Sequence, residues 1–501
     1  MDKQYIISID LGTSSCKTAL FNGTGTMVCI ASREHKTFFG ENGAAEQDPI
    51  EWWLGVRETI REVLWQSGIS GSQIAVVGID SQSSSMIPIG RDGDVLHNAM
   101  IWTDRRAVME KKWIDDNVGQ DILTKINGNR NDESNIAPKL MWFKNNCPKH
   151  YQHTYKILNA AGFLAYKLTG TFSCNLSEGG LTQLFDVEKG EWSEELVKAC
   201  ELDMDKLPGI YQCFDIVGNV TAQAGDSTGL LMGTPVVAGA MDAVSCGLGC
   251  GITKKGDAFI TGGTVTALGV CTDKPVRSGS LHVYHHIVPG TWCNMAGVDF
   301  GGGNYRWFRD KFMQECNSDN VYEEMNHMAE MVKAGADKLL FLPTLVGQRC
   351  PQWDGNMRGV FFGVSPNHGR EHFLRAIMEG NALAVREIME LLGKEGAVAQ
   401  ELRIAGGIAK SNIWMEIFAE VLARPLYLAE CEEATAMGNM INAAYGAGIL
   451  DSFENGKKFL NFEPVAVKKE NFEKYDSLYS IYKKLYPALG EQFLELAAVQ
   501  L

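Results

Sequence analysis

The chain has 501 residues, more than one ordinary hydrophobic core holds, so we expect two domains of roughly 250 residues each. A formal net charge of -15 at pH 7 disfavours nucleic acid or an anionic membrane as partner, because both require clustered Lys and Arg. A small-molecule substrate fits this charge better. The 13 Cys are odd in number and lack CxxC spacing, which favours reduced thiols over disulfides or a zinc site.

The N-terminal part predicts a three-strand meander followed by a helix. Residues 5–9 are rich in β-forming side chains and lead into a turn at 10–15, after which 17–21 predict the second strand of a hairpin. A third strand is expected over 27–30 and a helix over 50–66. No basic flank and apolar segment of the secretory kind precede the first strand, so we expect a cytoplasmic protein.

Further strands predict how the two halves are organised. Residues 75–79 and 99–102 are expected as buried strands of the same sheet, with ligand-facing residues at their ends. In the second half, 258–261 lead through a Gly-Gly-Thr turn to 265–270, which repeats the opening hairpin. Two similar α/β domains facing a central cleft are therefore predicted, as residues 1–246 and 247–501.

Two other segments are assigned no chemistry. Residues 227–253 carry no charge except Asp242, but Pro235 and six Gly exclude a membrane helix there. The tail from 471 to 501 has apolar residues at helical spacing and is predicted to be a packing helix. Its apolar positions are Leu478, Ile481, Tyr482, Leu485 and Tyr486.

The first turn has the composition of a phosphate site. Asp10 at the strand end can hold Mg²⁺, while Gly12, Thr13 and Ser14 supply backbone N–H groups and hydroxyls to phosphate oxygens. A plain hairpin turn is an equally good interpretation of this motif alone. The corresponding turn at Gly262-Gly263-Thr264 favours the phosphate site, since two such turns can hold phosphates between them.

Asp242 is the candidate general base. It lies among small apolar residues without an adjacent cation, so desolvation is expected to raise its pKa toward a value suited to proton transfer. A helix N-cap is the structural alternative. Residues 402–412 predict a strand, a turn at Gly406-Gly407 and a helix start, a geometry that can seat a nucleotide base. His285, His286, His368 and His372 are expected in ordinary surface or core roles, with no transition-metal site.

Taken together, these residues resemble the FGGY carbohydrate kinases. The most specific element is residues 359–364, which read Gly-Val-Phe-Phe-Gly-Val, followed after seven residues by 372–379, and this is similar to the family's C-terminal signature. Residues 46–49, 102–106 and 138–142 also match. The resemblance spans nearly the whole chain and implies the actin, hexokinase and chaperone-ATPase (ribonuclease H-like) fold, with ATP and Mg²⁺ as cofactors.

The resemblance also implies roles for particular residues. Asp242 matches the catalytic base, Asp10 the first phosphate motif, where it is expected to hold Mg²⁺, and residues 433–438 part of the adenosine region. Two positions depart from the family pattern: Val265 replaces a Ser and Ile408 a Gly, so one hydroxyl and one Gly are missing. The expected cofactor-binding residues are Asp10, Gly12, Thr13, Ser14, Lys17, Gly263, Thr264, Gly406, Gly407 and Asn412. The expected substrate-binding residues are Gln82, Ser83, Ser84, Trp102, Asp104, Arg106 and Asp242.

The acceptor is expected to be a ketopentose such as D-xylulose. Ser83-Ser84 stand where glycerol kinases carry Arg-Glu and typical xylulokinases carry Met-His, and Ala243 replaces an Asn common in xylulokinases. We therefore expect poor activity on glycerol. An aldonate such as gluconate, whose carboxylate could pair with Arg106 or another cleft Arg, or a polyol is the alternative substrate. An actin- or chaperone-like ATP-driven switch is the alternative class, and a homodimer is one option that the sequence leaves open.

Overall fold

A computed structural model of the protein describes residues 4–315, 320–431 and 433–499. These residues form two compact units, each assembled from three stretches of the chain, and each is considered by itself. The first unit comprises Met1–Lys254, Thr272–Cys293 and Glu433–Leu460, and the second comprises Lys255–Cys271, Asn294–Glu432 and Asn461–Leu501. The division into domains 1–246 and 247–501 stays a prediction.

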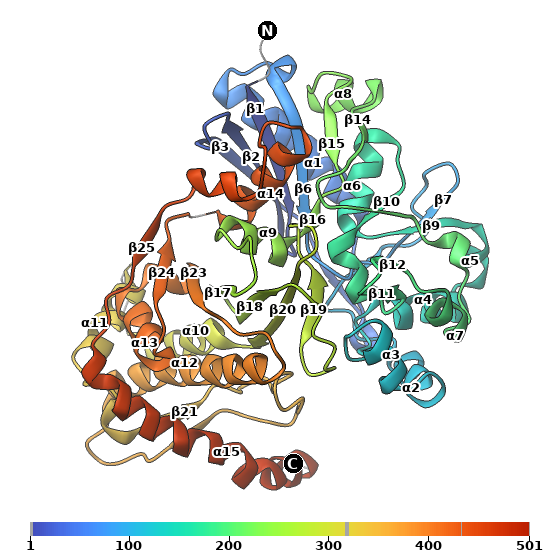
Figure 1. The fold of residues 1–501 in the computed structure, drawn as a ribbon. Helices are drawn as coiled ribbons and strands as arrows, with labels where there is room; N and C mark the ends of the chain where they lie inside the picture. Colours follow the sequence, from blue (N-terminus) through green and yellow to red (C-terminus); the bar gives the residue numbers. More distant parts are fainter. Residues whose placement is uncertain (1–3, 316–319, 432, 500–501) are drawn as a thin grey trace. The chain divides into compact units, whose positions relative to one another are not determined.

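The main sheet of the first unit confirms the predicted opening meander. Its strands follow one another in the order β14-β15-β6-β1-β2-β3, and β16 also pairs with β6 (Figure 1). β1 is antiparallel to β2 and parallel to β6. The bounds are β1 (Tyr5–Leu11), β2 (Ser15–Asn22), β3 (Met27–Glu34), β6 (Ile74–Ser81), β14 (Ile216–Asn219), β15 (Pro235–Val237) and β16 (Ala240–Met241).

Helices cover both faces of this sheet, and β1 and β6 are therefore buried along nearly their whole length. Ile7, Ile9 and Leu11 share a core with α1 and α6. Side chains alternate along a strand, so Ser8 and Asp10 face the other way, and Ser8 donates to Ala436 of α14. The bounds are α1 (Pro49–Ser67), α6 (Ala160–Thr169), α9 (Asp242–Gly249) and α14 (Ala434–Gly446).

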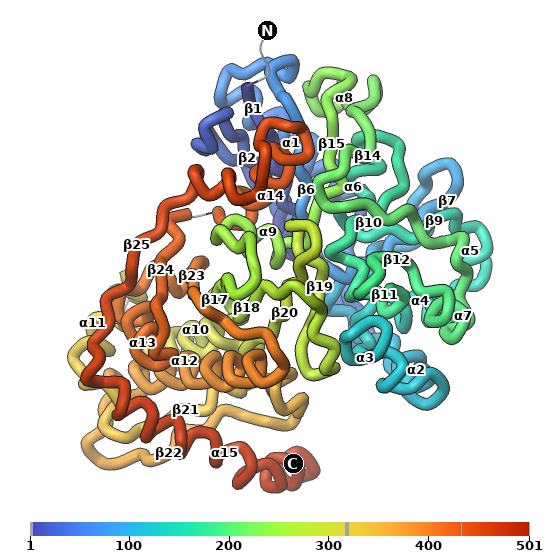
Figure 2. The backbone as a smooth tube through the Cα atoms, in the orientation of Figure 1, coloured from blue at the N-terminus to red at the C-terminus, as the bar shows by residue number. Residues whose placement is uncertain are grey.

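α14 joins the first unit although it lies more than 400 residues after β1 in the chain. It packs against β1, β6 and α9, as the course of the chain from blue to red in Figure 2 shows. The contact with α9 requires Gly438, since a Cβ there would lie 1.8 Å from the carbonyl oxygen of Ser245. A segment late in the sequence thus lies directly over the strands that end at the candidate site.

The predicted helix over 50–66 is confirmed as α1, whose ends carry the expected signals. The Asp48 side chain accepts from the backbone N–H of Ile50, Pro49 opens the helix, and Gly68 ends it with a left-handed backbone. The prediction for 99–102 is wrong: β8 (Ala99–Met100) pairs with β5 and not with the main sheet. This strand is only two residues long, and short apolar runs do not reveal their partner.

The remaining elements of the first unit are short. They include η3, a 3₁₀ segment over Leu176–Thr182 that packs against β16 and β19. The other strands are β4 (Phe38–Phe39), β5 (Ala45–Gln47), β7 (Ile87–Gly90), β9 (Thr154–Leu158), β10 (Ser173–Asn175), β11 (Phe185–Asp186), β12 (Glu191–Trp192), β13 (Gly209–Tyr211) and β19 (His282–His285). The other helices are α2 (Val108–Asn117), α3 (Gln120–Ile126), α4 (Ile136–Asn146), α5 (Pro148–His153), α7 (Glu194–Ala199) and α8 (Ala222–Thr228).

The second unit repeats the arrangement of the first, as predicted from the Gly-Gly-Thr turn. β17 (Asp257–Gly262) is antiparallel to β18 (Thr266–Thr272) and parallel to β23 (Glu401–Gly406). The strands follow one another as β20-β18-β17-β23-β24-β25. The other strands are β20 (Trp292–Val298), β21 (Leu340–Leu342), β22 (Val360–Phe362), β24 (Leu426–Ala429) and β25 (Phe462–Pro464), and the helices are α10 (Gly301–Phe312), α11 (Val321–Glu330), α12 (Arg370–Lys394), α13 (Asn412–Leu422) and α15 (Phe472–Ala498).

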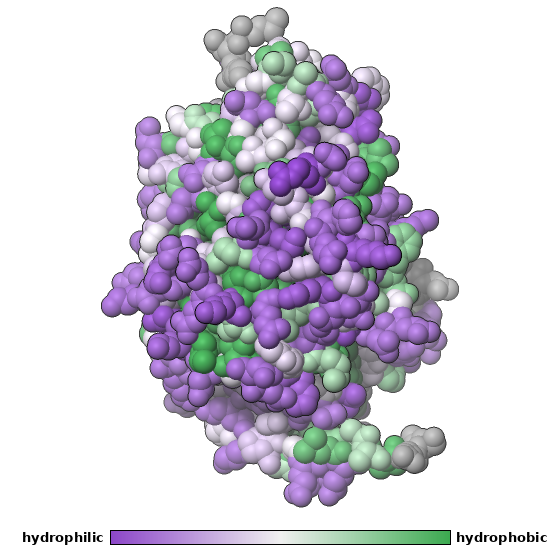
Figure 3. Space-filling view, turned by 90° about the vertical axis from the view of Figure 1, so that its right-hand side faces the viewer, coloured by the Kyte–Doolittle hydropathy of each residue, from purple (hydrophilic) through white to green (hydrophobic). Residues whose placement is uncertain are grey.

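The predicted C-terminal packing helix is confirmed as α15, which buries Tyr475, Leu478, Tyr482 and Leu485. Ile481, expected on the same face, is instead 44% exposed. Hydrophilic side chains cover most of the face in Figure 3, and hydrophobic ones form separate small groups there. Within residues 4–315, 320–431 and 433–499, no helix combines the length and apolar character needed to cross a membrane.

Candidate functional site

Three neighbouring strands of the first unit bring three carboxylates to one edge of the sheet. In the parallel pairing of β1 with β6, Asp10 lies opposite Asp80. β16 also runs parallel to β6, with Ala240 opposite Asp80, and Asp242 begins α9 directly after this strand. Parallel strands end at the same edge, and side chains there typically face ligands. Asp80 was not predicted as a site residue, and its only signal in the sequence is its place at the end of a buried strand.

Asp80 is fully buried, Asp10 and Asp242 are partly buried, and the pKa values of all three carboxyl groups are raised. Burial, followed by the charge of Asp10, raises the pKa of Asp242 to about 7, against the hydrogen bond from the N–H of Ala243. Burial also raises the pKa of Asp10 to about 6, with Lys17 acting in the opposite direction. The pKa of Asp80 is well above its ordinary value for the same reason, with Asp10 and Asp242 adding to it. Three neighbouring carboxyl groups are not readily ionised at the same time in such an arrangement unless a cation lies near them, because like charges disfavour ionisation.

Asp242 is the first residue of α9, and Met241 occupies the N-cap position. The Oδ1 atom of Asp242 accepts from the N–H of Ala243 at 2.7 Å. The N-cap alternative for Asp242 is therefore wrong by one residue, because α9 starts directly after β16. A carboxyl group whose pKa lies near 7 is suited to accept a proton at neutral pH.

The first turn is held in place by its neighbours. The N–H of Gly12 donates to the carbonyl of Ser15, which closes the turn between β1 and β2. The Oγ1 of Thr13 accepts from the Trp102 indole at 2.8 Å, and the Thr13 carbonyl accepts from Gln47 at 2.7 Å. Two residues predicted for separate roles, Thr13 for phosphate and Trp102 for substrate, are thus in direct contact.

Lys17 forms an ion pair with Glu433, whose carboxylate oxygen lies 2.9 Å from Nζ. Lys17 follows the first turn on β2, and Glu433 immediately precedes α14. The charge of Lys17 also lowers the pKa of Asp10. Lys17 therefore links the predicted metal residue to a segment that the resemblance assigned to the adenosine region.

Of the predicted substrate residues after β6, Gln82 and Ser84 are buried and hydrogen-bonded to polar groups. Gln82 donates to Gln47 at 2.9 Å. Ser84 adopts a left-handed backbone with φ of 55°, and its hydroxyl donates to the carbonyl of Ser134 at 2.8 Å. The buried Lys139 donates to the carbonyl of Ser84 at 2.8 Å. Ser83 between them is only partly buried.

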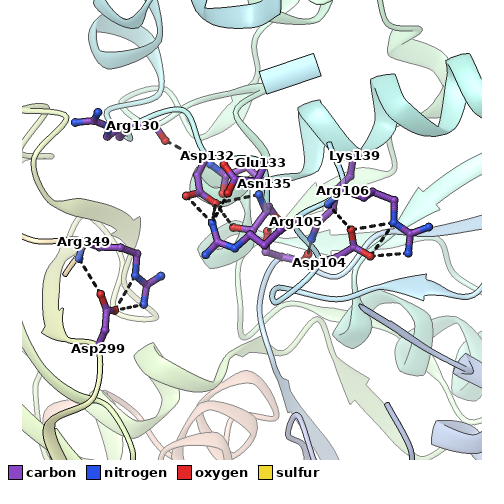
Figure 4. A network of polar contacts seen from close by, with 12 residues as sticks. Asp104, Arg105, Arg106, Arg130, Asp132, Glu133, Asn135, Lys139, Asp299 and Arg349 are labelled. Atoms are coloured by element: carbon purple, nitrogen blue, oxygen red, sulfur yellow. Dashed lines mark hydrogen bonds and ion pairs between the residues drawn. The ribbon is translucent and has the colours of Figure 1, made fainter. Parts of the chain in front are cut away.

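Asp104 and Arg106 bind each other. The guanidinium of Arg106 lies against Asp104 (Figure 4), which is fully buried. Its Nη2 lies 2.7 Å from Oδ2 of Asp104 and 2.7 Å from a carboxylate oxygen of Glu46. Arg106 also lies over the ring of Trp142. The neighbouring Arg105 binds Asp132 at 2.8 Å. Arg106, which was expected to pair with the carboxylate of an aldonate, is thus already bound by two carboxylates of the protein.

The nucleotide residues predicted in the second unit lie in two turns of its sheet. Thr264, between β17 and β18, accepts a hydrogen bond from Arg306. β23 ends at Gly406, whose φ of 90° suits Gly, and Gly407 opens a 3₁₀ turn before Asn412 begins α13. The predicted strand, turn and helix start are therefore confirmed. In the same unit Arg349 binds Asp299 (Figure 4), an ion pair that the sequence did not suggest.

Comparison with known proteins defines the class. Residues 5–249 match the N-terminal domain and residues 258–447 the C-terminal domain of the FGGY family of carbohydrate kinases. Together with the duplicated sheets and the carboxylate edge, these matches define a carbohydrate kinase. The chain belongs to the FGGY family, which confirms the resemblance drawn from the signature motifs.

Individual relatives cover the whole chain. It is 29% identical to a xylulose kinase of Bacillus subtilis over 96% of this chain and 97% of that protein. A gluconokinase of Bacillus licheniformis is 26% identical, with coverage of 99% and 98%. The crystal structure of a xylulose kinase from Rhodospirillum rubrum superposes with a TM-score of 0.91 at 26% identity, over 98% of this chain and 100% of that one.

Proposed function

We propose that this protein transfers the γ-phosphoryl group of ATP to a hydroxyl of a neutral sugar, a ketopentose of the D-xylulose type, with Asp242 as general base. The observation that carries the proposal is the partly buried Asp242 at the start of α9, directly after β16, whose pKa is raised to about 7. The similarity to xylulose kinases supports the acceptor. A cytoplasmic location and a homodimer stay predictions.

Asp242 accepts the proton of the attacking hydroxyl, and the remaining residues position the reactants. Positioning and charge neutralisation dominate phosphoryl transfer. The N–H groups and hydroxyls of Thr13 and Ser14 suit phosphate oxygens, while the N–H of Gly12 closes the turn. In the second unit, Gly263, Thr264, Gly406, Gly407 and Asn412 remain the predicted nucleotide contacts.

The carboxylates of Asp10 and Asp80 fit a Mg²⁺ ion. Both oxygens of the buried Asp80 lack a hydrogen-bond partner among the described residues, and carboxylate oxygens are the ligands that Mg²⁺ prefers. The described residues contain no group of three or more His, Cys, Asp or Glu arranged for a metal. One or two carboxylates with water and phosphate is the usual arrangement for Mg²⁺. When bound, the ion supplies positive charge to the phosphate oxygens.

Gluconate is the second candidate acceptor, and the similarity to gluconokinases favours it. The structure removes its main support in this chain, because Arg106 is bound by Asp104 and Glu46. Release of ADP in a coupled assay, measured with D-xylulose, D-ribulose, glycerol and D-gluconate, tests the proposal. Sugar-dependent ADP release with a ketopentose first is expected. Hydrolysis of ATP that no sugar accelerates would contradict it and favour a switch protein.

A further inference from the structure

Glu178 lies beside the predicted base on a segment that the sequence did not single out. It belongs to η3, where the Asn175 side chain accepts from the backbone N–H of Glu178. The neighbouring Ser177 hydroxyl accepts from the N–H of Met241 at 2.9 Å, one residue before Asp242. Gly180 permits close packing of the same segment, since a Cβ there would lie 2.7 Å from the carbonyl of Val283. The segment is thus fixed against β16 and β19.

The carboxyl group of Glu178 is only half satisfied. Its Oε2 accepts from the backbone N–H of Ser84 at 3.2 Å. Its Oε1 is buried and has no hydrogen-bond partner among the described residues. Burial raises the pKa of Glu178 to about 8, Asp242 adds to this, and Ser84 and Lys139 oppose it. Near neutral pH Glu178 therefore carries a proton and can both donate and accept.

Other unsatisfied polar atoms gather on the same elements. Gln82 Oε1 and Ser85 Oγ lie directly after β6, and Ser245 Oγ lies one turn after Asp242 on α9; none has a partner among the described residues. η3, β6, β16 and α9 pack together. Buried polar atoms are normally hydrogen-bonded, so such a concentration indicates a polar ligand. A neutral polyol or sugar, with alternating donor and acceptor oxygens, matches this set.

We propose that Glu178 is a specificity residue for the acceptor, which hydrogen-bonds a hydroxyl or carbonyl oxygen of a neutral sugar and disfavours an acceptor that carries a carboxylate. This assignment rests on the proposed function. A carboxylate would lie near Asp10 and Asp242, which repel it when they are ionised, and the protonated Glu178 supplies no positive charge to offset that repulsion. Lys139 is not available to pair with an acceptor carboxylate, because its ammonium group donates to three backbone carbonyls, those of Ser84, Met100 and Ile101.

Two variants test the proposal. Glu178→Met keeps the approximate size of the side chain and removes both hydrogen-bonding oxygens, whereas Glu178→Gln keeps the shape and a donor. We expect Glu178→Met to raise the KM for D-xylulose by about 10-fold to 100-fold, with kcat and the KM for ATP nearly unchanged, as expected when a site loses a hydrogen bond to a substrate oxygen. Glu178→Gln should restore most of the affinity. The preference for D-xylulose over D-gluconate should fall in Glu178→Met.

A pH series separates this role from simple packing. Titration above about pH 8 ionises Glu178 and removes its donor, so the affinity of the wild type for D-xylulose should fall there, while that of Glu178→Gln should not. The titratable groups around Glu178 are Asp242 on α9, Lys139 on α4, Cys174 on β10 and Cys213. Comparison of the two proteins at each pH cancels the titration of these other groups.

Glu110→Met is the matched control, because Glu110 is a buried carboxyl group on α2 that accepts from Asn145. It should leave the KM for D-xylulose unchanged. An unchanged KM in both Glu178 variants, or a loss that follows only their melting temperature, overturns the assignment. If Glu178→Met does not fold, the pH series with Glu178→Gln decides, and equal pH profiles overturn it. If the wild type phosphorylates no sugar, the proposed function fails and the assignment with it.

Discussion

Lys17 Nζ lies 2.9 Å from a carboxylate oxygen of Glu433, although 416 residues separate the two positions. The pair connects the turn after β1 with the start of α14. Both side chains are partly exposed, at 35% and 28%, so the pair contributes little to folding. Its effect on Asp10 is more important, because the charge of Lys17 lowers the pKa of that carboxyl group.

Lys17→Met is therefore expected to weaken ATP use more than stability. Without the cation the pKa of Asp10 rises further, and fewer molecules carry the ionised Asp10 that we propose holds Mg²⁺. We expect kcat/KM for ATP to fall by about 10-fold to 100-fold, the scale of one charged hydrogen bond. Lys17→Arg should retain more activity, and Arg33→Met, which removes an exposed ion pair with Glu62, is the control. Equal kinetics in Lys17→Met and the wild type would contradict a role for Lys17.

Asp242→Asn is expected to fold and to bind ATP but to lose most sugar phosphorylation. The substitution removes the base at nearly constant shape, and general-base catalysis contributes about 10² to 10⁴-fold. Steady-state kinetics with the preferred sugar gives the loss in kcat, and calorimetric titration with an ATP analogue verifies binding. Near wild-type turnover in this variant would show that another group accepts the proton.

The same carboxyl group makes activity depend on pH. A base must be unprotonated, so kcat/KM of the wild type for the sugar should rise with pH up to about 7. The neutral sugar does not titrate between pH 5 and 8, so its own ionisation does not contribute to the profile. A flat profile between pH 5 and 8 would argue against Asp242 as the base.

Stability should show the opposite trend. Folding raises the pKa of Asp242 from 3.8 to about 7, so the native state holds this proton more tightly than the unfolded chain. The resulting stabilisation is fully present below 3.8 and is lost as the pH rises to about 7. Asn does not titrate, so Asp242→Asn should gain in melting temperature over the wild type as the pH rises through this range. Thermal unfolding at pH 5 and 8 measures the difference.

The sequence predicted the parts of the fold that local patterns determine. The hairpins β1–β2 and β17–β18 each combine apolar strands with a Gly-containing turn, and the turn at Gly406 lies between a strand and a helix. Asp242 was predicted as the base because small apolar residues flank it in the sequence, a pattern that predicts desolvation of its carboxyl group. In each case the relevant residues are adjacent in the chain.

The parts that were missed depend on distant segments. β8 was placed in the wrong sheet because two apolar residues do not specify a partner. Asp80 and Glu178 approach Asp242 only in the folded protein, where β6, η3 and α9 pack around β16. The order of residues in the sequence gives no sign of this proximity. Arg106 was predicted to be available for a ligand, but it binds Asp104 and Glu46. Glu46 lies 60 residues away in the chain, so the sequence does not reveal this contact.

The structure also separates Ser83 from Ser84, the pair that was expected to determine the acceptor. Ser84 is 3% exposed, binds Glu178 through its N–H and Ser134 through its hydroxyl, and holds a left-handed backbone. A larger side chain there must disturb these contacts, and a left-handed backbone already costs about 1–3 kcal/mol for a residue other than Gly. Ser83 is only partly buried and can accept a larger side chain.

Ser83→Met is therefore expected to shift the substrate ranking toward D-xylulose while it preserves stability. Ser84→His, the second half of the change to the xylulokinase-like Met-His pair, should lower the melting temperature and the activity on every sugar, because it disrupts the loop that carries Gln82. Values of kcat/KM for D-xylulose and D-ribulose, with thermal unfolding of each variant, distinguish the two effects. Ser84→Gly relieves the backbone conformation and serves as the control for strain. An unchanged ranking in a stable Ser83→Met protein would show that this residue does not contact the acceptor.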